Sequence, residues 1–237
     1  KAGALENGMK TAKHDIFAIF DADFRPQAGF LREIVHYFSD PKVGVAQARW
    51  GHLNEDQSLL TKVQGLMLNG HFLIEHPSRN RNGLFFNMNG TGGLWRREAI
   101  EEAGGWSHDT ITEDLDLSYR AQMKGWKFVF TPDIVCPAEL PVEMNAYKSQ
   151  QHRWAKGSIQ VMFKVLPALL RSKERLGVKV EGFFHLSTNL CYLLVVPMCL
   201  LSLPMLVLRA RIADGTVGAV IDIGILLYAA VVGFQLI

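Results

Sequence analysis

Asp21 and Asp23 lie one residue apart, directly after a short apolar run at residues 15–20. Such a run is typical of a strand buried on both faces of a parallel sheet, and open α/β sheets bind ligands where their strands end. Two carboxylates at that point can present oxygen ligands to one hard cation, Mg²⁺ or Mn²⁺, which would neutralise a leaving diphosphate. Acids in a loop are usually just solvated, so the pattern alone leaves both interpretations open.

A second acidic group, Thr112-Glu113-Asp114, stands where a helix over residues 113–124 is expected to begin. A carboxylate there can deprotonate an attacking sugar hydroxyl as a general base. The simpler interpretation is that Thr112 caps the helix while the two acids complement the positive end of its dipole. Taken alone, the acidic group favours this capping interpretation.

Gln150, Arg153 and Trp154 share one face of a helix expected over residues 143–170, because they are spaced i, i+3 and i+4. This combination suits a site that holds a phosphate beside a sugar ring. The arginine would bind the phosphate, the tryptophan would stack on the sugar and the glutamine would form hydrogen bonds with it. A stacked Arg–Trp pair at an interface is the alternative.

The elements that must position these residues follow an α/β pattern. Strands are expected at residues 15–20, 43–48 and 126–130, the last closed by Pro132, and helices at 26–38, 57–75, 96–103, 113–124 and 143–170. Strands that alternate with helices indicate a mainly parallel sheet flanked by helices. A glycine-rich turn at residues 89–93 precedes the helix expected at 96–103.

Two long apolar stretches, residues 183–208 and 217–237, finish the chain. Each reaches the roughly 20 residues that a membrane-spanning helix needs. A pair of buried core helices is the alternative, but it would need a partner domain. We therefore divide the chain into an α/β domain at 1–164, an amphipathic interfacial segment at 165–182 and two transmembrane helices at 183–237. Arg171, Lys173, Arg175 and Lys179 precede the first span and favour a cytoplasmic α/β domain.

Composition excludes some classes of protein. A net charge of only +2 gives no electrostatic case for nucleic-acid binding. The three cysteines have neither disulfide-framework nor zinc spacing, which fits a reducing compartment. His71, His76, His108 and His152 also lack metal-ligand spacing, and we interpret them as structural or solvated. Because the chain starts at Lys1 and ends within an apolar run, we expect it to be a fragment.

The order of the three motifs, followed by membrane helices, resembles the processive family 2 glycosyltransferases, the cellulose synthase-like and glucomannan synthase-like group. The resemblance covers essentially the whole chain. It implies a GT-A-type nucleotide-sugar-binding domain and a divalent cation, Mg²⁺ or Mn²⁺. It also implies inverting transfer of a hexose from UDP-glucose or GDP-mannose to a growing β-linked polysaccharide. The protein would then be integral to the plasma membrane, or to the Golgi membrane in a eukaryote.

The same resemblance implies roles for individual residues. Asp114 matches the general base. Lys1, Asp21, Asp23 and Arg153 match donor-binding residues, and Asp21 and Asp23 also match the metal-binding motif, with Asp23 preferred as the direct ligand. Gln150, Trp154 and Glu113 match the acceptor side. The family's first nucleotide-binding aspartates would precede Lys1.

One segment departs from the family pattern. Residues 89–93 occupy the place of the acceptor-side loop but lack its Phe-Phe-Cys-Gly-Ser form, which leaves the acceptor open. Trp95 and Trp106 flank this segment and would either stack on sugar or support the fold. The alternatives are a non-processive family 2 enzyme that adds one sugar to a lipid carrier and, from another class, a transporter subunit. The donor sugar, the linkage and the need for an accessory subunit stay open.

Overall fold

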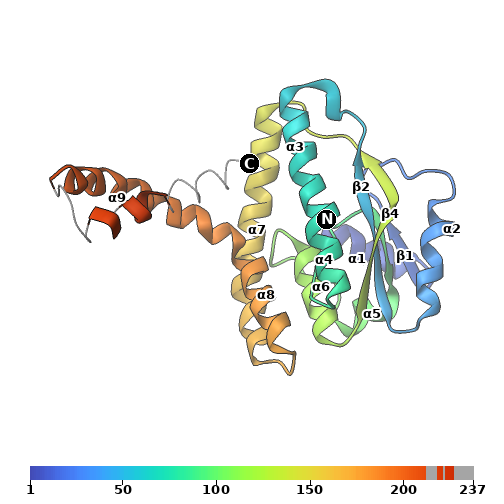
Figure 1. Cartoon of the computed structure of the whole chain (residues 1–237). Coiled ribbons are helices and arrows are strands. Elements are labelled where there is room, and N and C mark those ends of the chain that lie inside the picture. The colour runs from blue at the N-terminus through green and yellow to red at the C-terminus, as the bar shows by residue number, and fades with distance from the viewer. Residues whose placement is uncertain (212–217, 221, 227–237) are drawn as a thin grey trace. The chain divides into compact units, whose positions relative to one another are not determined.

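The computed structural model describes residues 1–211, 218–220 and 222–226. The chain forms two compact units, one from Lys1 to Leu186 and one from Ser187 onward. The first unit contains a four-stranded sheet with α2 on one face and α3, α4 and α6 on the other (Figure 1). The helices are α1 (Ala2–Thr11), α2 (Phe30–Ile34), α3 (Leu59–Gly70), α4 (His76–Arg81), α5 (Arg97–Glu102), α6 (Glu113–Met123), α7 (Met144–Arg171), α8 (Leu176–Ser187) and α9 (Cys191–Arg211).

The sheet is mixed, which corrects the expectation of a mainly parallel one. Its strands are β1 (Ile16–Ile19), β2 (Val43–His52), β3 (Gly93–Arg96) and β4 (Lys127–Ala138), in the spatial order β1-β3-β2-β4. β2 and β4 pair in parallel, whereas β3 is antiparallel to both β1 and β2. The sequence pattern did not predict β3, and this strand, inserted between β1 and β2, changes the sheet type.

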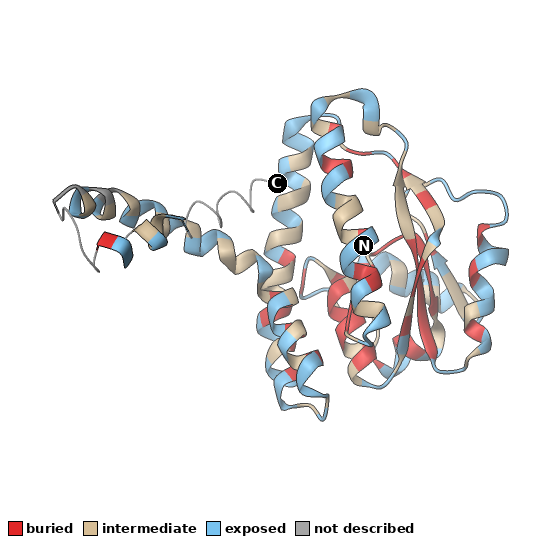
Figure 2. Ribbon diagram, in the orientation of Figure 1, coloured by how far each residue is buried: buried red, intermediate tan, exposed pale blue. Residues whose placement is uncertain are grey.

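Alternating side chains on the strands build a core on each face of the sheet. On β3, Trp95 packs with Phe86 and Phe128 on the face covered by α3–α6, while Leu94 packs with Phe30 and Ile34 on the face covered by α2. Figure 2 shows the buried residues gathered along the strands and on the helix sides that face them. Because both faces are covered, the sheet can present functional side chains only at the ends of its strands.

Two predicted boundaries are wrong for local reasons. β4 continues past Pro132 because its pairing with β2 shifts between Thr131 and Val135, so the proline lies in a bulge where no ladder hydrogen bond is required of it. The helix expected from residue 26 begins only at Phe30, after Gly29 with a φ of 96°.

The predicted helix at 57–75 is divided into several pieces. A 3₁₀ turn at Glu55–Gln57 precedes α3, and a π-helical turn at His71–Glu75 joins α3 to α4. Further 3₁₀ turns lie at Val35–Ser39 and Thr188–Leu190. Such π-helical turns are frequent at functional sites.

One helix among the described residues, Leu176–Arg209, is long and apolar enough to cross a membrane. It contains the first predicted span, residues 183–208. The second predicted span, 217–237, lies mostly outside the described residues. In the second unit Asp222 forms an ion pair with Arg209, with N–O distances of 2.8 and 3.1 Å. The division of the chain at residues 164 and 182 stays a prediction.

Candidate active site

Asp21 and Asp23 lie in a tight turn just after β1. The Phe24 N–H donates to the Asp21 carbonyl over 3.0 Å, and Phe24 bridges to Ala138 at the end of β4. This anchors both ends of the turn, so the carboxylates stand at the sheet edge that the sequence predicted. Asp23 is exposed, and within the described part of the chain no hydrogen bond or ion pair engages its carboxylate.

Lys1 approaches the first of these carboxylates. Its Nζ lies 2.5 Å from Asp21 Oδ1 and donates to the Gly90 carbonyl over 2.8 Å. The Asp21 N–H in turn donates to Thr91 Oγ1 over 2.8 Å. The two charged side chains are 34% and 40% exposed, so a ligand can still reach them.

Gly90 brings Asp114 to the same place. The glycine has a φ of 75°, and a Cβ added to it would lie 3.1 Å from Asp114 Oδ2 and 3.5 Å from Lys1 Nζ. Only glycine accepts both that conformation and that crowding without strain. The structure therefore joins Lys1, Asp21 and Asp114 around the glycine-rich segment 89–92.

The Asp114 carboxyl group has an unusual proton affinity. Burial, followed by the negative charge of Glu113, raises its pKa to about 7, and Lys1 opposes this rise. A carboxylate with a pKa near neutrality can take up a proton at physiological pH and release it again. Glu113 is itself buried beside Asp114.

Thr112 does not act as the helix cap that its position suggested. Its side chain makes no capping hydrogen bond to α6, and its buried Oγ1 has no hydrogen-bond partner among the described residues. Thr112 instead packs on Gly157 of α7, where an added Cβ would lie 2.6 Å from Oγ1. The absence of a side chain at residue 157 is thus what lets α7 approach the start of α6.

This contact orients the third predicted motif. Gln150, Trp154 and Gly157 share one face of α7, spaced i, i+4 and i+7, and that face is turned toward the N-terminus of α6 at Gly157. Gln150 and Trp154 are half-buried, whereas Arg153 is exposed. Within the described residues, no hydrogen bond or ion pair joins Arg153 to Lys1 or the acids.

Charged side chains around the buried Asp116 also join α6 to α7. Asp116, which is fully buried, lies 2.7 Å from Arg120 and 3.1 Å from Lys164 of α7. Lys164 also pairs with Asp109 at 2.7 Å. The predicted base and the Gln-x-x-Arg-Trp helix are therefore held together by packing and by charge.

The residues at the strand end fit a divalent cation shared with a diphosphate. No group of three or more His, Cys, Asp or Glu side chains that could hold a metal occurs in the part of the chain that the structure describes. Mg²⁺-type ions, however, commonly bind through one or two carboxylates, waters and substrate phosphates. Asp23 is accessible for this, while Asp21 is paired with Lys1.

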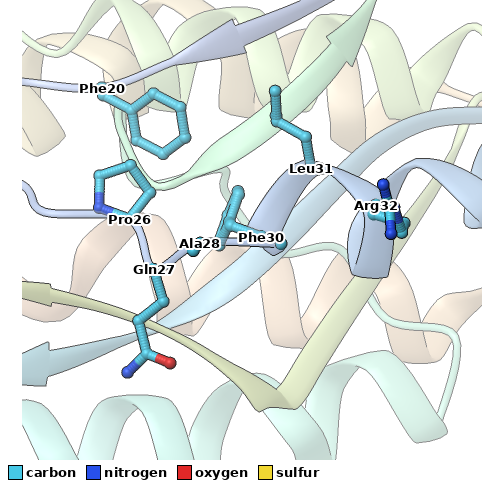
Figure 3. Close-up of a pocket in the computed structure, with 8 residues that line it drawn as sticks. Phe20, Pro26, Gln27, Ala28, Phe30, Leu31 and Arg32 are labelled. Carbon is cyan, nitrogen blue, oxygen red and sulfur yellow. The ribbon is translucent and has the colours of Figure 1, made fainter.

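Trp95 and a surface hollow beside α2 do not belong to this site. Trp95 is fully buried against Trp106 and Phe128, which excludes it from stacking on sugar. A surface hollow beside α2 holds none of the predicted site residues, as Figure 3 shows. It is lined by Phe20, Pro26, Gln27, Ala28, Gly29, Phe30, Leu31 and Arg32.

Sequence reasoning missed Trp50 at the site. The half-buried Trp50 ring packs edge-on against Phe24, and its N–H lies 3.4 Å from the Thr91 carbonyl. The signal that could have found it is an aromatic residue near the end of a predicted strand.

Comparison with known proteins defines the class. Residues 16–236 match the model of Glycosyl transferase family group 2, and the chain belongs to this family. Among curated proteins it is similar to probable glucomannan 4-beta-mannosyltransferase 4 of Oryza sativa subsp. japonica, with 43% identity over 190 residues, 78% of this chain and 34% of the relative. It is also 38% identical over 216 residues to glucomannan 4-beta-mannosyltransferase 2 of Arabidopsis thaliana, covering 85% of this chain and 40% of the relative.

A solved structure supports the fold. The mannosyltransferase PcManGT from Pyrobaculum calidifontis, in complex with GDP-Man and Mn²⁺, superposes with a TM-score of 0.60 at 20% identity. The match covers 97% of this chain and 60% of that one. The chain spans 34 to 40% of the length of the curated relatives, so it corresponds to one part of proteins of that size.

Proposed function

We propose that the protein containing this chain is an inverting glycosyltransferase that transfers a hexose from a nucleotide sugar to a growing β-linked polysaccharide. The observation that carries the proposal is the meeting of Lys1, Asp21 and Asp114 around Gly90 at the sheet edge. It unites a group able to accept a proton near neutral pH with charged groups suited to a diphosphate. The names of the relatives favour mannose as the transferred sugar, so GDP-mannose is the first donor to test and UDP-glucose is the alternative.

In the proposed step, the acceptor hydroxyl gives its proton to the Asp114 carboxylate as its oxygen attacks the anomeric carbon. The bond from that carbon to the diphosphate oxygen breaks on the opposite face, and the nucleoside diphosphate leaves with the electron pair. A single displacement of this kind inverts the configuration, so an α-linked donor yields a β-linked product. Lys1 and Arg153 stabilise the negative charge of the leaving group.

Other residues hold the two substrates. A divalent cation, held by Asp23 with support from Asp21, supplies positive charge to the diphosphate when it is bound. Trp154 offers a flat surface to the acceptor sugar, while Gln150 and Glu113 form hydrogen bonds with its hydroxyl groups. In this proposal the apolar helix Leu176–Arg209, which is long enough to cross a membrane, anchors the protein there, and transfer takes place on the cytoplasmic side.

The test is sugar incorporation by the full-length protein in isolated membranes. Radiolabelled GDP-mannose and UDP-glucose are supplied separately, with Mn²⁺ or Mg²⁺ and with EDTA. We expect cation-dependent labelling of high-molecular-weight polymer, and its loss in Asp114→Asn with donor binding largely kept. Labelling of only a small, lipid-extractable product would identify the non-processive alternative, and labelling from neither donor would overturn the proposal.

A further inference from the structure

A series of hydrogen bonds leads from the π-helical turn at His71–Glu75 to the glycine-rich segment of the site. The Glu75 carboxylate lies 3.0 Å from His71 Nδ1, and His71 Nε2 lies 3.1 Å from Asn89 Nδ2. On its other side, Asn89 Oδ1 lies 2.9 Å from Nε2 of His76, which is fully buried at the start of α4. Histidine side chains therefore hold both ends of the Asn89 amide.

The direction of each hydrogen bond follows from the chemistry of the groups. The Asn89 amide donates through Nδ2 and accepts through Oδ1. His71 must then accept through an unprotonated Nε2 and donate through Nδ1 to Glu75. This hydrogen bond is the main reason that the pKa of Glu75 falls to about 2, so its carboxylate is charged and keeps His71 oriented. His76 donates through Nε2, shared between Asn89 and the Asn87 carbonyl.

The backbone of the same segment is held from the sheet. Gln47 of β2, which is fully buried, accepts from the Asn89 N–H over 3.0 Å. Its amide nitrogen lies 3.2 Å from the carbonyls of Thr91 and Gly92. Buried hydrogen bonds of this kind fix a conformation, because leaving any one of them unmade is costly.

The segment held in this way is the one that assembles the site. The Gly90 carbonyl accepts from Lys1, and Thr91 Oγ1 accepts from the Asp21 N–H. A Cβ added to Gly90 would lie 3.1 Å from Asp114 Oδ2. A shift of Asn89 would therefore move three predicted functional groups relative to one another. Misplacement of reacting groups by about 1 Å can lower a rate about 100-fold.

We infer that His71 and Asn89 are positioning residues for sugar transfer. The His71–Asn89 hydrogen bond holds Gly90 and Thr91 where they align Lys1, Asp21 and Asp114. His71 acts from the π-helical turn, where the wider helical turn sets its ring beside Asn89. The inference rests on the proposed function, since it concerns the geometry of the same site.

The experiment compares variants of the full-length protein in sugar transfer. His71→Leu and Asn89→Ala each remove one partner of the hydrogen bond, and we expect kcat to fall about 10- to 100-fold, the range that a small displacement of reacting groups produces. The donor KM should change less than kcat, because Lys1 and Asp21 also form an ion pair with each other directly and can keep it when the segment shifts. His71→Gln keeps an acceptor toward Asn89 and a donor toward Glu75, and it should recover most of kcat.

His14→Gln serves as the matched control, because His14 is an exposed histidine away from the network, and it should leave kcat unchanged. Thermal unfolding of each variant shows whether it remains folded. The inference is overturned if His71→Leu and Asn89→Ala keep the kcat of the unaltered protein. A loss that His71→Gln does not recover, and that tracks a loss of folded protein, also overturns it. An unaltered protein that transfers no sugar would instead contradict the proposed function.

Discussion

At the scale of single residues, Asp114 links structure to a measurable pH dependence. Burial and the charge of Glu113 raise its pKa to about 7. A general base works only in its deprotonated form, so kcat/KM for transfer should rise with pH, bend near 7 and level off above it. Asp114→Asn should remove the activity altogether. The measurement is a pH–rate profile of the full-length protein between pH 5 and 9.

Two further variants show which group controls that profile. Glu113→Gln removes the neighbouring negative charge, so the bend should move to lower pH, whatever happens to acceptor affinity. Asp109→Asn is the control, because hydrogen bonds from Lys164 and Ser107 lower the pKa of Asp109 to about 2 and keep it charged throughout this range. An unshifted bend in Glu113→Gln would assign the titration to another group.

The same shift predicts how stability depends on pH. The ordinary pKa of an aspartate is 3.8, and the folded value for Asp114 is about 7. Between these values the folded state binds more protons than the unfolded one, so stability is lost as pH rises through this window. Asp114→Asn does not titrate, so its melting temperature relative to the unaltered protein should rise from pH 4 to pH 7 and then level off. A constant difference across this range would contradict the raised pKa.

At the scale of elements, Gly157 sets the distance between α6 and α7. A side chain there would collide with Thr112, at the start of the helix that carries the predicted base. Gly157→Ala should cost about 1 to 3 kcal/mol of stability, as overpacking usually does. It should also lower transfer, since α7 carries Gln150 and Trp154.

Gly8→Ala is the matched control for this substitution. Gly8 lies inside α1, and an added Cβ would contact nothing within 4 Å. Replacing a helix-interior glycine by alanine should then be stabilising by about 0.5 to 1 kcal/mol. Thermal unfolding of both variants checks the pair, and an unchanged melting temperature in Gly157→Ala would mean that α7 can move away at little cost.

The elements also show what a sequence pattern can and cannot predict. β1 and β2 were predictable because continuous apolar runs mark buried strands. β3 was not, since Gly93–Arg96 has only two apolar side chains between a glycine-rich turn and a helix, and it exists as a strand through its pairing with β1 and β2. The continuation of β4 past Pro132 depends likewise on a bulge opposite β2, which no local rule reveals.

The candidate site was likewise predictable only in part. Motif order was enough to select Asp21 and Asp114. Their proximity depends on the conformation of Gly90, and spacing along the chain does not encode that proximity. Because His71 and His76 lack metal-ligand spacing, the sequence favours a structural or solvated role for them. Their link to Asn89 arises from a π-helical turn that interrupts the regular helix expected at residues 57–75.

At the scale of the whole molecule, the candidate site concerns the chemistry of transfer, whereas the apolar helix concerns its location. All predicted site residues lie within the unit Lys1–Leu186. The apolar helix Leu176–Arg209 is long and apolar enough to cross a membrane, and that assignment rests on its length and composition. Its position in a bilayer therefore needs a test that is independent of sugar transfer.

The cysteines offer that test, because they report on different environments. Cys191 and Cys199 lie in α9, and the Cys199 side chain is exposed on the helix surface. If α9 spans a bilayer, a membrane-impermeant maleimide should fail to label both in sealed membranes, since thiols in hydrocarbon are shielded from water. Cys136 should also stay unlabelled, because it is buried in the core and burial raises the pKa of its thiol to about 11. All three should react after denaturation, as mapped by mass spectrometry of the labelled peptides.

Lys13→Cys provides the control for access, since Lys13 is exposed in the α/β unit. This residue should be labelled in inside-out vesicles and protected in right-side-out ones if the site faces the cytoplasm. Labelling of Cys199 in sealed vesicles of both orientations would mean that α9 lies in water, and the apolar helix would then need a protein partner to cover it. Protection of Cys199 together with labelling of residue 13 only in inside-out vesicles would place the proposed transfer at the cytoplasmic face, where a nucleotide-sugar donor can reach Lys1 and Asp21.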